Sequence, residues 1–212
     1  EQVAEWHIPL CAGIEQSVAA SKSFIASLTA TARFVAYASD DAGLINALQT
    51  LPEKLKAACN NRWQTAITAL KSADKAYVIG RGLGETIARE CALKLKETCG
   101  IQAEAFSSAE VRHGPMQVIQ PGYPVLVLAL RGPEQADCLR FARDMRERGA
   151  QVLLAAPEDI AERDLDLICT DDLHLDPVTA IQSFYLMVES LAIARGMNPD
   201  APAYLKKITK TV

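Results

Sequence analysis

The feature that most constrains the fold is an alternation of short apolar segments with longer amphipathic segments, which begins near residue 73. The apolar segments are "KAYVIG" (75–80), "PVLVLAL" (124–130) and "AQVLLAAP" (150–157). Between them lie "GETIARECALKLKETCG" (84–100) and "PEQADCLRFARDMRERG" (133–149), which have the length of helices and end in glycine. Glycine is common just after a helix because it adopts the left-handed backbone conformation. Strands that alternate with helices predict βαβ units and a parallel sheet with helices on both faces.

Three further segments complete this α/β prediction. "AEAF" (103–106) and "DLICT" (166–170) are predicted to be short strands, and "PVTAIQSFYLMVESLAIARG" (177–196) a long helix. The run at 124–130 is apolar on both faces, as in a central parallel strand, and it is far too short to span a bilayer. The tail that follows residue 196 is predicted to be an ordered extension of the same domain.

The first 72 residues have a different pattern. "EWHIPLC" (5–11) predicts a short strand, and apolar residues at helical spacing predict a long helix from about Ser17 to Ala38, with Ser17 as its N-cap. The segment 41–61 predicts one or two helices that are broken at Pro52. The chain does not begin with Met and its opening residues read like the middle of a longer polypeptide, so we expect an N-terminal truncation.

Composition argues against several classes of function. The formal net charge is -4 and the pI about 5.5, whereas nucleic-acid binders usually carry a basic face. The six cysteines include no CxxC pair and no His/Cys ligand spacing, so neither a metal site nor a disulfide framework is predicted. With no signal peptide visible, these features favour a cytoplasmic protein that has neither nucleic acid nor membrane as a partner.

Charged residues on the helix predicted at 84–100 are the first candidates for chemistry. Glu90, Lys94 and Glu97 are four and three residues apart and therefore share one helix face. One interpretation is a solvated face with ordinary ion pairs. The other is that this helix follows a glycine turn at the end of a strand, where open α/β sheets bind ligands, so that a carboxylate beside a lysine could transfer protons.

Two other motifs also have a structural and a functional interpretation. "GRGLGE" (80–85) could hold a phosphate at a helix N-terminus, but Glu85 occupies the last position of G-x-G-x-x-G, which favours a tight strand-to-helix turn. His113 in "RHGP" is one of three histidines. A structural role is common for such a residue, yet the following Gly-Pro would fix a turn and aim the ring.

Taken together, "ALKLKE" (92–97), "AEAF" (103–106), "EVRHGP" (110–115) and the tail "LKKIT" (205–209) resemble the sugar isomerase (SIS) domain family. The similarity is greatest to the isomerase half of glucosamine-6-phosphate synthase and to the type II glucosamine-6-phosphate deaminases. The segment "AGIEQSVAASKSF" (12–24) resembles the one that closes the first of two SIS domains in those proteins.

This resemblance implies two tandem SIS domains of flavodoxin-like topology, each a parallel sheet sandwiched by helices, with the first domain incomplete in this chain. Residues 1–40 would be the C-terminal remnant of the first SIS domain, 41–72 a helical connector, and 73–212 the second SIS domain with its C-terminal tail. The family's S-x-S-G-x-S/T loop, which holds the sugar phosphate, is absent from the sequence, so this chain alone is expected to hold its substrate poorly.

The resemblance also implies residue roles. Glu97 matches the base that moves a proton between C1 and C2 of the open-chain sugar. His113 matches the histidine that assists ring opening from the partner subunit, and Lys207 matches the tail lysine associated with opening the cyclic ketose. Ala20 stands where the synthase usually has serine. The substrate-binding positions implied are Lys94, Val18, Ala19 and Ala20.

The implied activity is that of a phosphosugar aldose–ketose isomerase or deaminase, foremost deamination of glucosamine 6-phosphate to fructose 6-phosphate and ammonia. Ala20 and the compact tail favour the deaminases. The alternatives are the isomerase part of a glutamine-dependent glucosamine-6-phosphate synthase, a ketosamine-phosphate deglycase, and a non-catalytic sugar-phosphate-binding SIS module. No cofactor is implied, and the expected partners are a phosphorylated amino sugar or ketose and a second copy in a homodimer.

Overall fold

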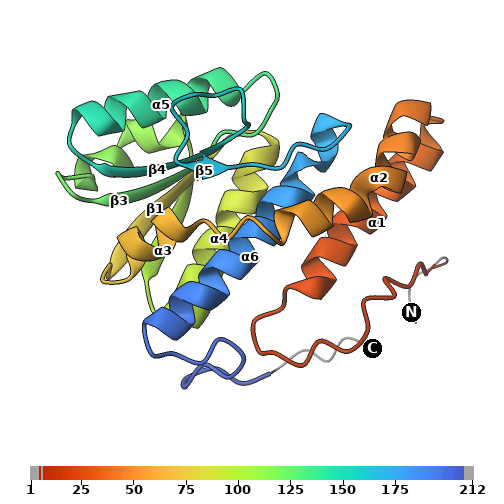
Figure 1. The fold of residues 1–212 in the computed structure, drawn as a ribbon, viewed down its shortest axis with the longest axis horizontal. Helices are drawn as coiled ribbons and strands as arrows, with labels where there is room; N and C mark the ends of the chain where they lie inside the picture. Colours follow the sequence, from red (N-terminus) through yellow and green to blue (C-terminus); the bar gives the residue numbers. More distant parts are fainter. Residues whose placement is uncertain (1–4, 6, 208–212) are drawn as a thin grey trace.

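A single parallel sheet forms the centre of the molecule (Figure 1). The computed structural model describes residue 5 and residues 7–207. Within that part of the chain the strand order is β2-β1-β3-β4-β5, which is the order of flavodoxin-like sheets and confirms the predicted fold class. The strands are β1 (Lys75–Gly80), β2 (Gln102–Ser107), β3 (Pro124–Leu128), β4 (Gln151–Ala156) and β5 (Leu165–Asp166).

Helices cover both faces of this sheet (Figure 1). On one face lie α3 (Gln64–Leu70), α4 (Leu83–Cys99) and α6 (Asp176–Ala194), and on the other lies α5 (Gln135–Glu147). Short 3-10 helices, η1 (Glu110–His113), η2 (Pro115–Val118) and η3 (Leu173–Leu175), lie in the connections. A hairpin of α1 (Lys22–Ala38) and α2 (Ala42–Ala58) packs against α6, outside the sheet layers.

The strands divide their apolar side chains between two buried clusters because successive residues of a strand point to opposite faces. In β1, Val78 lies in the cluster with Leu95 of α4 and Phe184 of α6, whereas Ile79 lies in the cluster with Phe141 of α5. β3 alternates in the same way. The sheet is therefore buried on both faces, which explains why its strands read as continuous apolar runs in the sequence.

The break predicted at Pro52 is wrong, because α2 is one helix that runs through the proline. Proline in a helix interior removes one backbone hydrogen bond and crowds the preceding turn. Here Leu51 and Leu55, beside the proline, pack in a cluster that includes Val178 of α6. Burial of this apolar face stabilises the continuous helix despite the lost hydrogen bond.

Two predictions for the N-terminal segment are also wrong. Residues 7–11 form no strand, and Trp6 lies outside the described residues. These residues lie beside α1 rather than at a sheet edge, so they have no strand to pair with. The first helix begins at Lys22 and not at Ser17, because the Ser17 hydroxyl is hydrogen-bonded to Asp200 instead of capping a helix.

The strand predicted at 166–170 is shorter than expected. The end of the predicted strand does not pair with the sheet, because the backbone of Thr170 is hydrogen-bonded to side chains. The Thr170 N–H donates to Asp176 at 2.8 Å, and the Thr170 carbonyl accepts from Arg131 at 2.7 Å. The tight turn predicted at 80–85 is confirmed. A Cβ at Gly80 would lie 2.2 Å from the carbonyl oxygen of Gly84, so only glycine allows α4 to start this close to β1.

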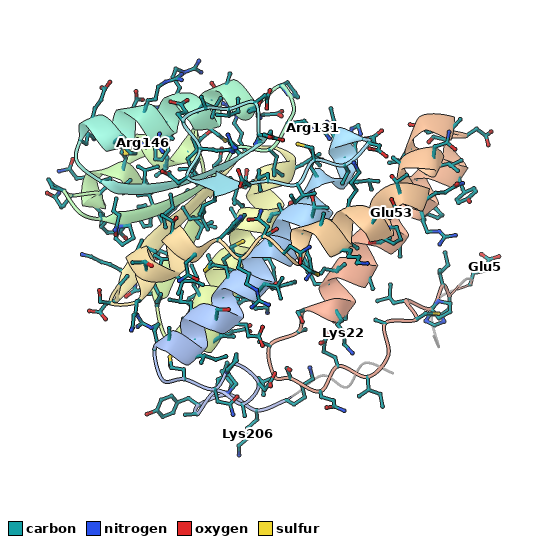
Figure 2. All side chains as sticks on the ribbon, in the orientation of Figure 1. Glu5, Lys22, Glu53, Arg131, Arg146 and Lys206 are labelled. Atoms are coloured by element: carbon teal, nitrogen blue, oxygen red, sulfur yellow. The ribbon has the colours of Figure 1, made fainter. Side chains whose placement is uncertain are left out.

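The surface carries the charged side chains expected of a chain of this composition, among them the exposed Glu53 of α2 and Lys206 of the tail (Figure 2). Within the described residues no group of three or more His, Cys, Asp or Glu side chains is placed to hold a metal ion, and the six cysteines are free thiols. One helical stretch of the described residues, Leu173–Ala194, is long and apolar enough to cross a membrane, but 61% of its most apolar 18-residue window is buried inside the fold, as in a core helix.

Candidate active site

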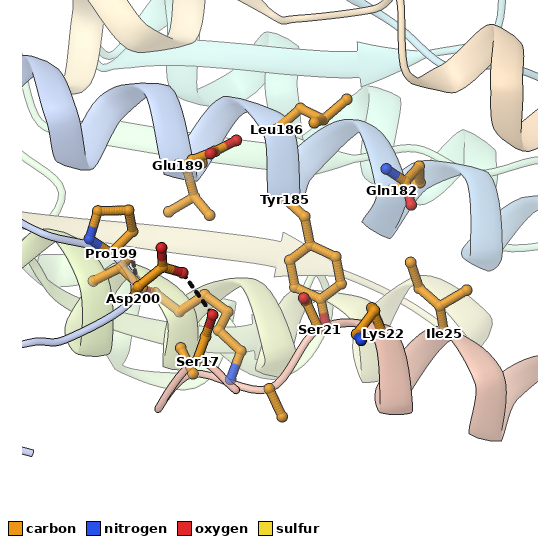
Figure 3. Close-up of a pocket in the computed structure, with 15 residues that line it drawn as sticks. Ser17, Ser21, Lys22, Ile25, Gln182, Tyr185, Leu186, Glu189, Pro199 and Asp200 are labelled. Carbon is orange, nitrogen blue, oxygen red and sulfur yellow. Dashed lines mark hydrogen bonds between the residues drawn. The ribbon is translucent and has the colours of Figure 1, made fainter. Parts of the chain in front are cut away.

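A pocket of about 300 Å³ lies where the segment before α1 meets α4, α6 and the tail (Figure 3). Its wall includes Ala19 and Ala20 from the segment before α1, Lys94 from α4, Tyr185 from α6 and Asp200 from the tail. This volume is at the lower end of the range for small-molecule sites. Elements distant in sequence thus bring three of the predicted binding residues, Lys94, Ala19 and Ala20, to one cavity.

Lys94 is held between two carboxylates of its own helix. Its Nζ lies 2.6 Å from Oε2 of Glu97 and 3.3 Å from Oε1 of Glu90. The exposed fractions of the side chains are 6% for Lys94, 10% for Glu90 and 23% for Glu97. The interpretation as an ordinary solvated face is therefore wrong for these residues. A buried ammonium with two carboxylates can donate and accept protons beside the pocket.

The position of this network along α4 differs from the sequence-based expectation. The expected ligand position was the glycine turn at the strand end, where α4 begins. Lys94 lies eleven residues after Leu83, which places it about 16 Å along the helix at 1.5 Å per residue. At the turn itself the side chains pair internally, with Arg81 bonded to Asp137 and the Glu134 carboxylate against Gly82. A cavity of about 310 Å³ does lie at this turn, but the Lys94 network adjoins the other pocket, which lies beside the second half of α4.

Tyr185 closes one side of the network from α6 (Figure 3). Its hydroxyl donates to Oε1 of Glu90 at 2.8 Å. Burial raises the pKa of Glu90, although the nearby Lys94 charge and this hydrogen bond oppose the rise. Burial and the Glu90 carboxylate also raise the pKa of Tyr185 far above its ordinary value, so the phenol remains a donor.

Glu15, which sequence reasoning missed, organises the segment before α1. Its buried carboxylate Oε2 accepts from the backbone N–H of Ser23 at 2.8 Å, the Ser23 hydroxyl at 2.8 Å and the backbone N–H of Ser21 at 3.3 Å. Burial alone would raise its pKa, but these hydrogen bonds and the Lys22 charge lower it overall. A carboxylate that satisfies the free N–H groups at a helix start is a known device, and Glu15 supplies it from outside the helix.

We expect Glu15→Ala to destabilise the protein by about 1–3 kcal/mol, because buried N–H groups lose their acceptor. The Glu15 pKa is lowered in the folded state, so its contribution is present above the ordinary pKa of 4.5 and is lost as the pH falls through the folded value. Urea denaturation at pH 7 and pH 3 measures both effects. Equal stability of wild type and variant at pH 7 would contradict this role, and Glu53→Ala on the exposed face of α2 is the control.

The C-terminal tail is hydrogen-bonded to the segment before α1. The Ser17 hydroxyl donates to Asp200 at 2.5 Å, and the backbone N–H of Val18 donates to the Asp200 carbonyl at 3.2 Å. Lys207 Nζ donates to the carbonyl oxygen of Ser17 at 2.6 Å. Lys207 and Val18 therefore lie next to the residues that line the pocket, although neither is part of its wall.

His113 does not join this group. It is the last residue of η1, which follows β2, and it is exposed and absent from the pocket wall. Its neighbour Arg112 pairs with Asp144 of α5, on the other side of the sheet from α6. Within one copy of the chain, the pocket wall therefore contains Lys94, Ala19 and Ala20. Glu97, Val18 and Lys207 are not part of the wall but adjoin its residues Lys94 and Ser17, whereas His113 lies apart.

The sequence profile of the SIS domain matches residues 69–193, which include the whole sheet, α4, α5 and all but the last residue of α6. The chain belongs to the SIS domain family. The match begins after α2, so the segment 12–24 and the α1–α2 hairpin lie outside the matched SIS domain. The proposed division into 1–40, 41–72 and 73–212 remains a prediction.

Curated relatives match nearly the whole of this SIS chain. A glutamine–fructose-6-phosphate aminotransferase (isomerizing) from Aeropyrum pernix is 32% identical over 98% of this chain, and one from Streptococcus pneumoniae is 30% identical over 96%. In both comparisons the chain spans only 36% of the relative's length. The likeness therefore concerns about a third of these larger proteins.

Solved structures show the same SIS fold. A candidate phosphosugar isomerase from Silicibacter pomeroyi superposes with a TM-score of 0.86 at 37% identity and covers 94% of this chain and 61% of that one. A glucosamine-6-phosphate deaminase from Thermotoga maritima has a TM-score of 0.71 at 23% identity over 91% of this chain and 58% of that one, which supports the fold alone. The chain is thus a SIS protein with phosphosugar isomerases among its structural neighbours.

Proposed function

We propose that the protein catalyses aldose–ketose chemistry on a phosphorylated amino sugar, and foremost the deamination of glucosamine 6-phosphate to fructose 6-phosphate and ammonia. The observation that supports this proposal is the Lys94–Glu97 pair, 2.6 Å apart, in which the buried Lys94 lines a pocket of about 300 Å³. A shielded acid–base pair is what proton transfer between adjacent carbons requires. A site for simple binding needs polar contacts but no such pair.

In the proposed reaction Glu97 removes the proton from C2 of the open-chain aldose while the C1 carbonyl oxygen gains a proton, which gives an enolamine. A proton then returns to C1 as the nitrogen loses one, which gives the 2-imino ketose. Water adds to the carbon–nitrogen double bond, the C–N bond breaks, and ammonia leaves with fructose 6-phosphate as the other product. Lys94 stabilises the charge that develops on O1 in the first step.

The remaining predicted residues have roles around this step. The backbone of Val18 and Ala19, with Ala20, contacts the sugar, and Lys207 acts during ring opening from its position beside the Ser17 carbonyl. His113 would assist ring opening in the site of a second copy, and so the proposal includes a homodimer. A cytoplasmic location also belongs to the proposal, because phosphosugars are intracellular metabolites.

A second candidate is the isomerase part of a glutamine-dependent aminotransferase. The curated relatives at 30–32% identity favour it, since they carry that name. The same Glu97 chemistry would then form glucosamine 6-phosphate, with glutamine as the nitrogen source. A ketosamine-phosphate deglycase uses the same proton transfer on another substrate, whereas a sugar-phosphate-binding module needs none.

Ammonia release separates these candidates. We expect the native protein to form ammonia and fructose 6-phosphate in equal amounts from glucosamine 6-phosphate without glutamine, as measured by coupled enzyme assays. Formation of glucosamine 6-phosphate only when glutamine is supplied would favour the aminotransferase. Tight binding of the sugar with no turnover in either direction would leave the binding module and contradict the proposed catalysis.

A further inference from the structure

Tyr185 is a pocket residue whose hydroxyl bonds to a charged network rather than to the backbone. Its ring projects from α6 toward Ser21 and the start of α1 (Figure 3). The hydroxyl lies 2.8 Å from Oε1 of Glu90. This Glu90 oxygen also lies 3.3 Å from Lys94 Nζ. One carboxylate oxygen therefore joins the phenol of α6 to the ammonium of α4.

The protonation state of the Glu90 carboxyl determines whether the Lys94 ammonium lies between two carboxylates or beside only one. The Glu90 side chain is mostly buried, and burial raises its pKa, which favours the neutral form. A neutral Glu90 would no longer attract the Lys94 ammonium, which would then pair with Glu97 alone. The hydrogen bond from Tyr185 opposes this outcome because it stabilises the anion.

Titratable groups from α4, α6, the N-terminal segment with the start of α1, and the tail face this part of the pocket. Burial and the Glu90 charge raise the pKa of Cys91 well above its ordinary value, so that thiol stays neutral. Tyr185 also stays protonated, and Glu97 opposes ionisation of Glu90 through its like charge. The groups are Cys91, Lys94 and Glu97 on α4, Tyr185 and Glu189 on α6, Glu15 before α1, Lys22 at the start of α1 and Asp200 of the tail.

We propose that Tyr185 is a positioning residue that keeps Glu90 anionic through its hydroxyl and thereby holds the Lys94 ammonium at the pocket wall. Its link to catalysis rests on the proposed function, because Lys94 acts there beside Glu97. The phenol does not itself take or give a proton in the reaction. It sets the lowest pH at which the network keeps its arrangement.

Tyr185→Phe removes the hydroxyl and keeps the ring that forms the pocket wall. We expect the acid limb of the kcat/KM profile to move to higher pH by about one unit, because a hydrogen bond to a charged group is lost. At high pH, where Glu90 is ionised in both proteins, kcat/KM should stay within a few-fold of wild type. A uniform loss of activity with no movement of the acid limb would mean a merely structural role and would overturn the proposal.

A second readout needs no substrate. In protein with ¹³C-labelled glutamate, the Glu90 carboxyl signal, assigned with Glu90→Gln, can be titrated by NMR in wild type and in Tyr185→Phe. We expect its midpoint to rise by about one unit in the variant and to stay unchanged in the control Tyr37→Phe, whose side chain is exposed on α1. An unchanged midpoint in Tyr185→Phe would overturn the proposal. If the wild-type protein turned over no phosphosugar, the proposed function would fail while this titration still tested Tyr185.

Discussion

Replacement of Glu97 by Gln is expected to lower kcat for the phosphosugar reaction by about 10²–10⁴, because a positioned base contributes on that order to a proton transfer. The amide has nearly the shape of the carboxylate, so the dissociation constant of the sugar should change only a few-fold. Steady-state kinetics and calorimetric binding measure the two quantities separately. A loss in kcat without a loss in binding is characteristic of a group that acts in the transition state.

Glu85→Gln is the matched control for this variant. Glu85 lies in the first turn of α4, far from the pocket wall, and pairs with Arg89. It should leave kcat unchanged. Full activity of Glu97→Gln would remove this residue as the base, and equal losses in both variants would point to a general effect on α4.

Lys94→Met should cause the largest loss of stability, about 3–5 kcal/mol, because it leaves buried carboxylates without their cation. The side chains of Lys94 and Glu90 are only 6% and 10% exposed. Methionine has a similar length and preserves most of the packing, so charge is the main quantity that changes. Lys96→Met, on the exposed side of the same helix, is the control and should be nearly neutral.

The loss in Lys94→Met should depend on pH. Burial already raises the pKa of Glu90, and without the lysine charge this pKa rises further. A carboxyl with a raised folded-state pKa contributes stability below the ordinary value of 4.5, and this contribution is lost as the pH rises through the folded value. The variant should therefore be closer to wild type at pH 5 than at pH 8 in urea denaturation. A loss independent of pH would show that packing, and not charge, dominates.

The sheet and its helices could be predicted because their signals are local. β1 was expected at 75–80 and is found there, since a strand buried on both faces is a continuous apolar run bounded by polar residues and glycine. Gly100, in the left-handed conformation just after α4, is likewise a local signal for the end of that helix. The helix through Pro52 could not be predicted, because packing against α6 overrides the local preference of proline.

The candidate site was only partly predictable. The spacing of Glu90, Lys94 and Glu97 places them on one helix face, but only the fold shows that this face is buried beside a pocket. Tyr185 lies 95 residues from Glu90 and reads as one more apolar residue in a core helix. Glu15 has no signal beyond its place just before a helix start, because its acceptor role depends on how the segment folds back.

The fate of hydrogen at C2 tests the central claim most directly. Glucosamine 6-phosphate labelled with deuterium at C2 can be incubated with wild-type protein and with Glu97→Gln and followed by NMR. The account predicts that wild type removes the label from C2, either to C1 or to solvent, and that Glu97→Gln does so at least about a hundred-fold more slowly. Label that stays at C2 with wild type, or leaves equally fast with both proteins, would contradict the account.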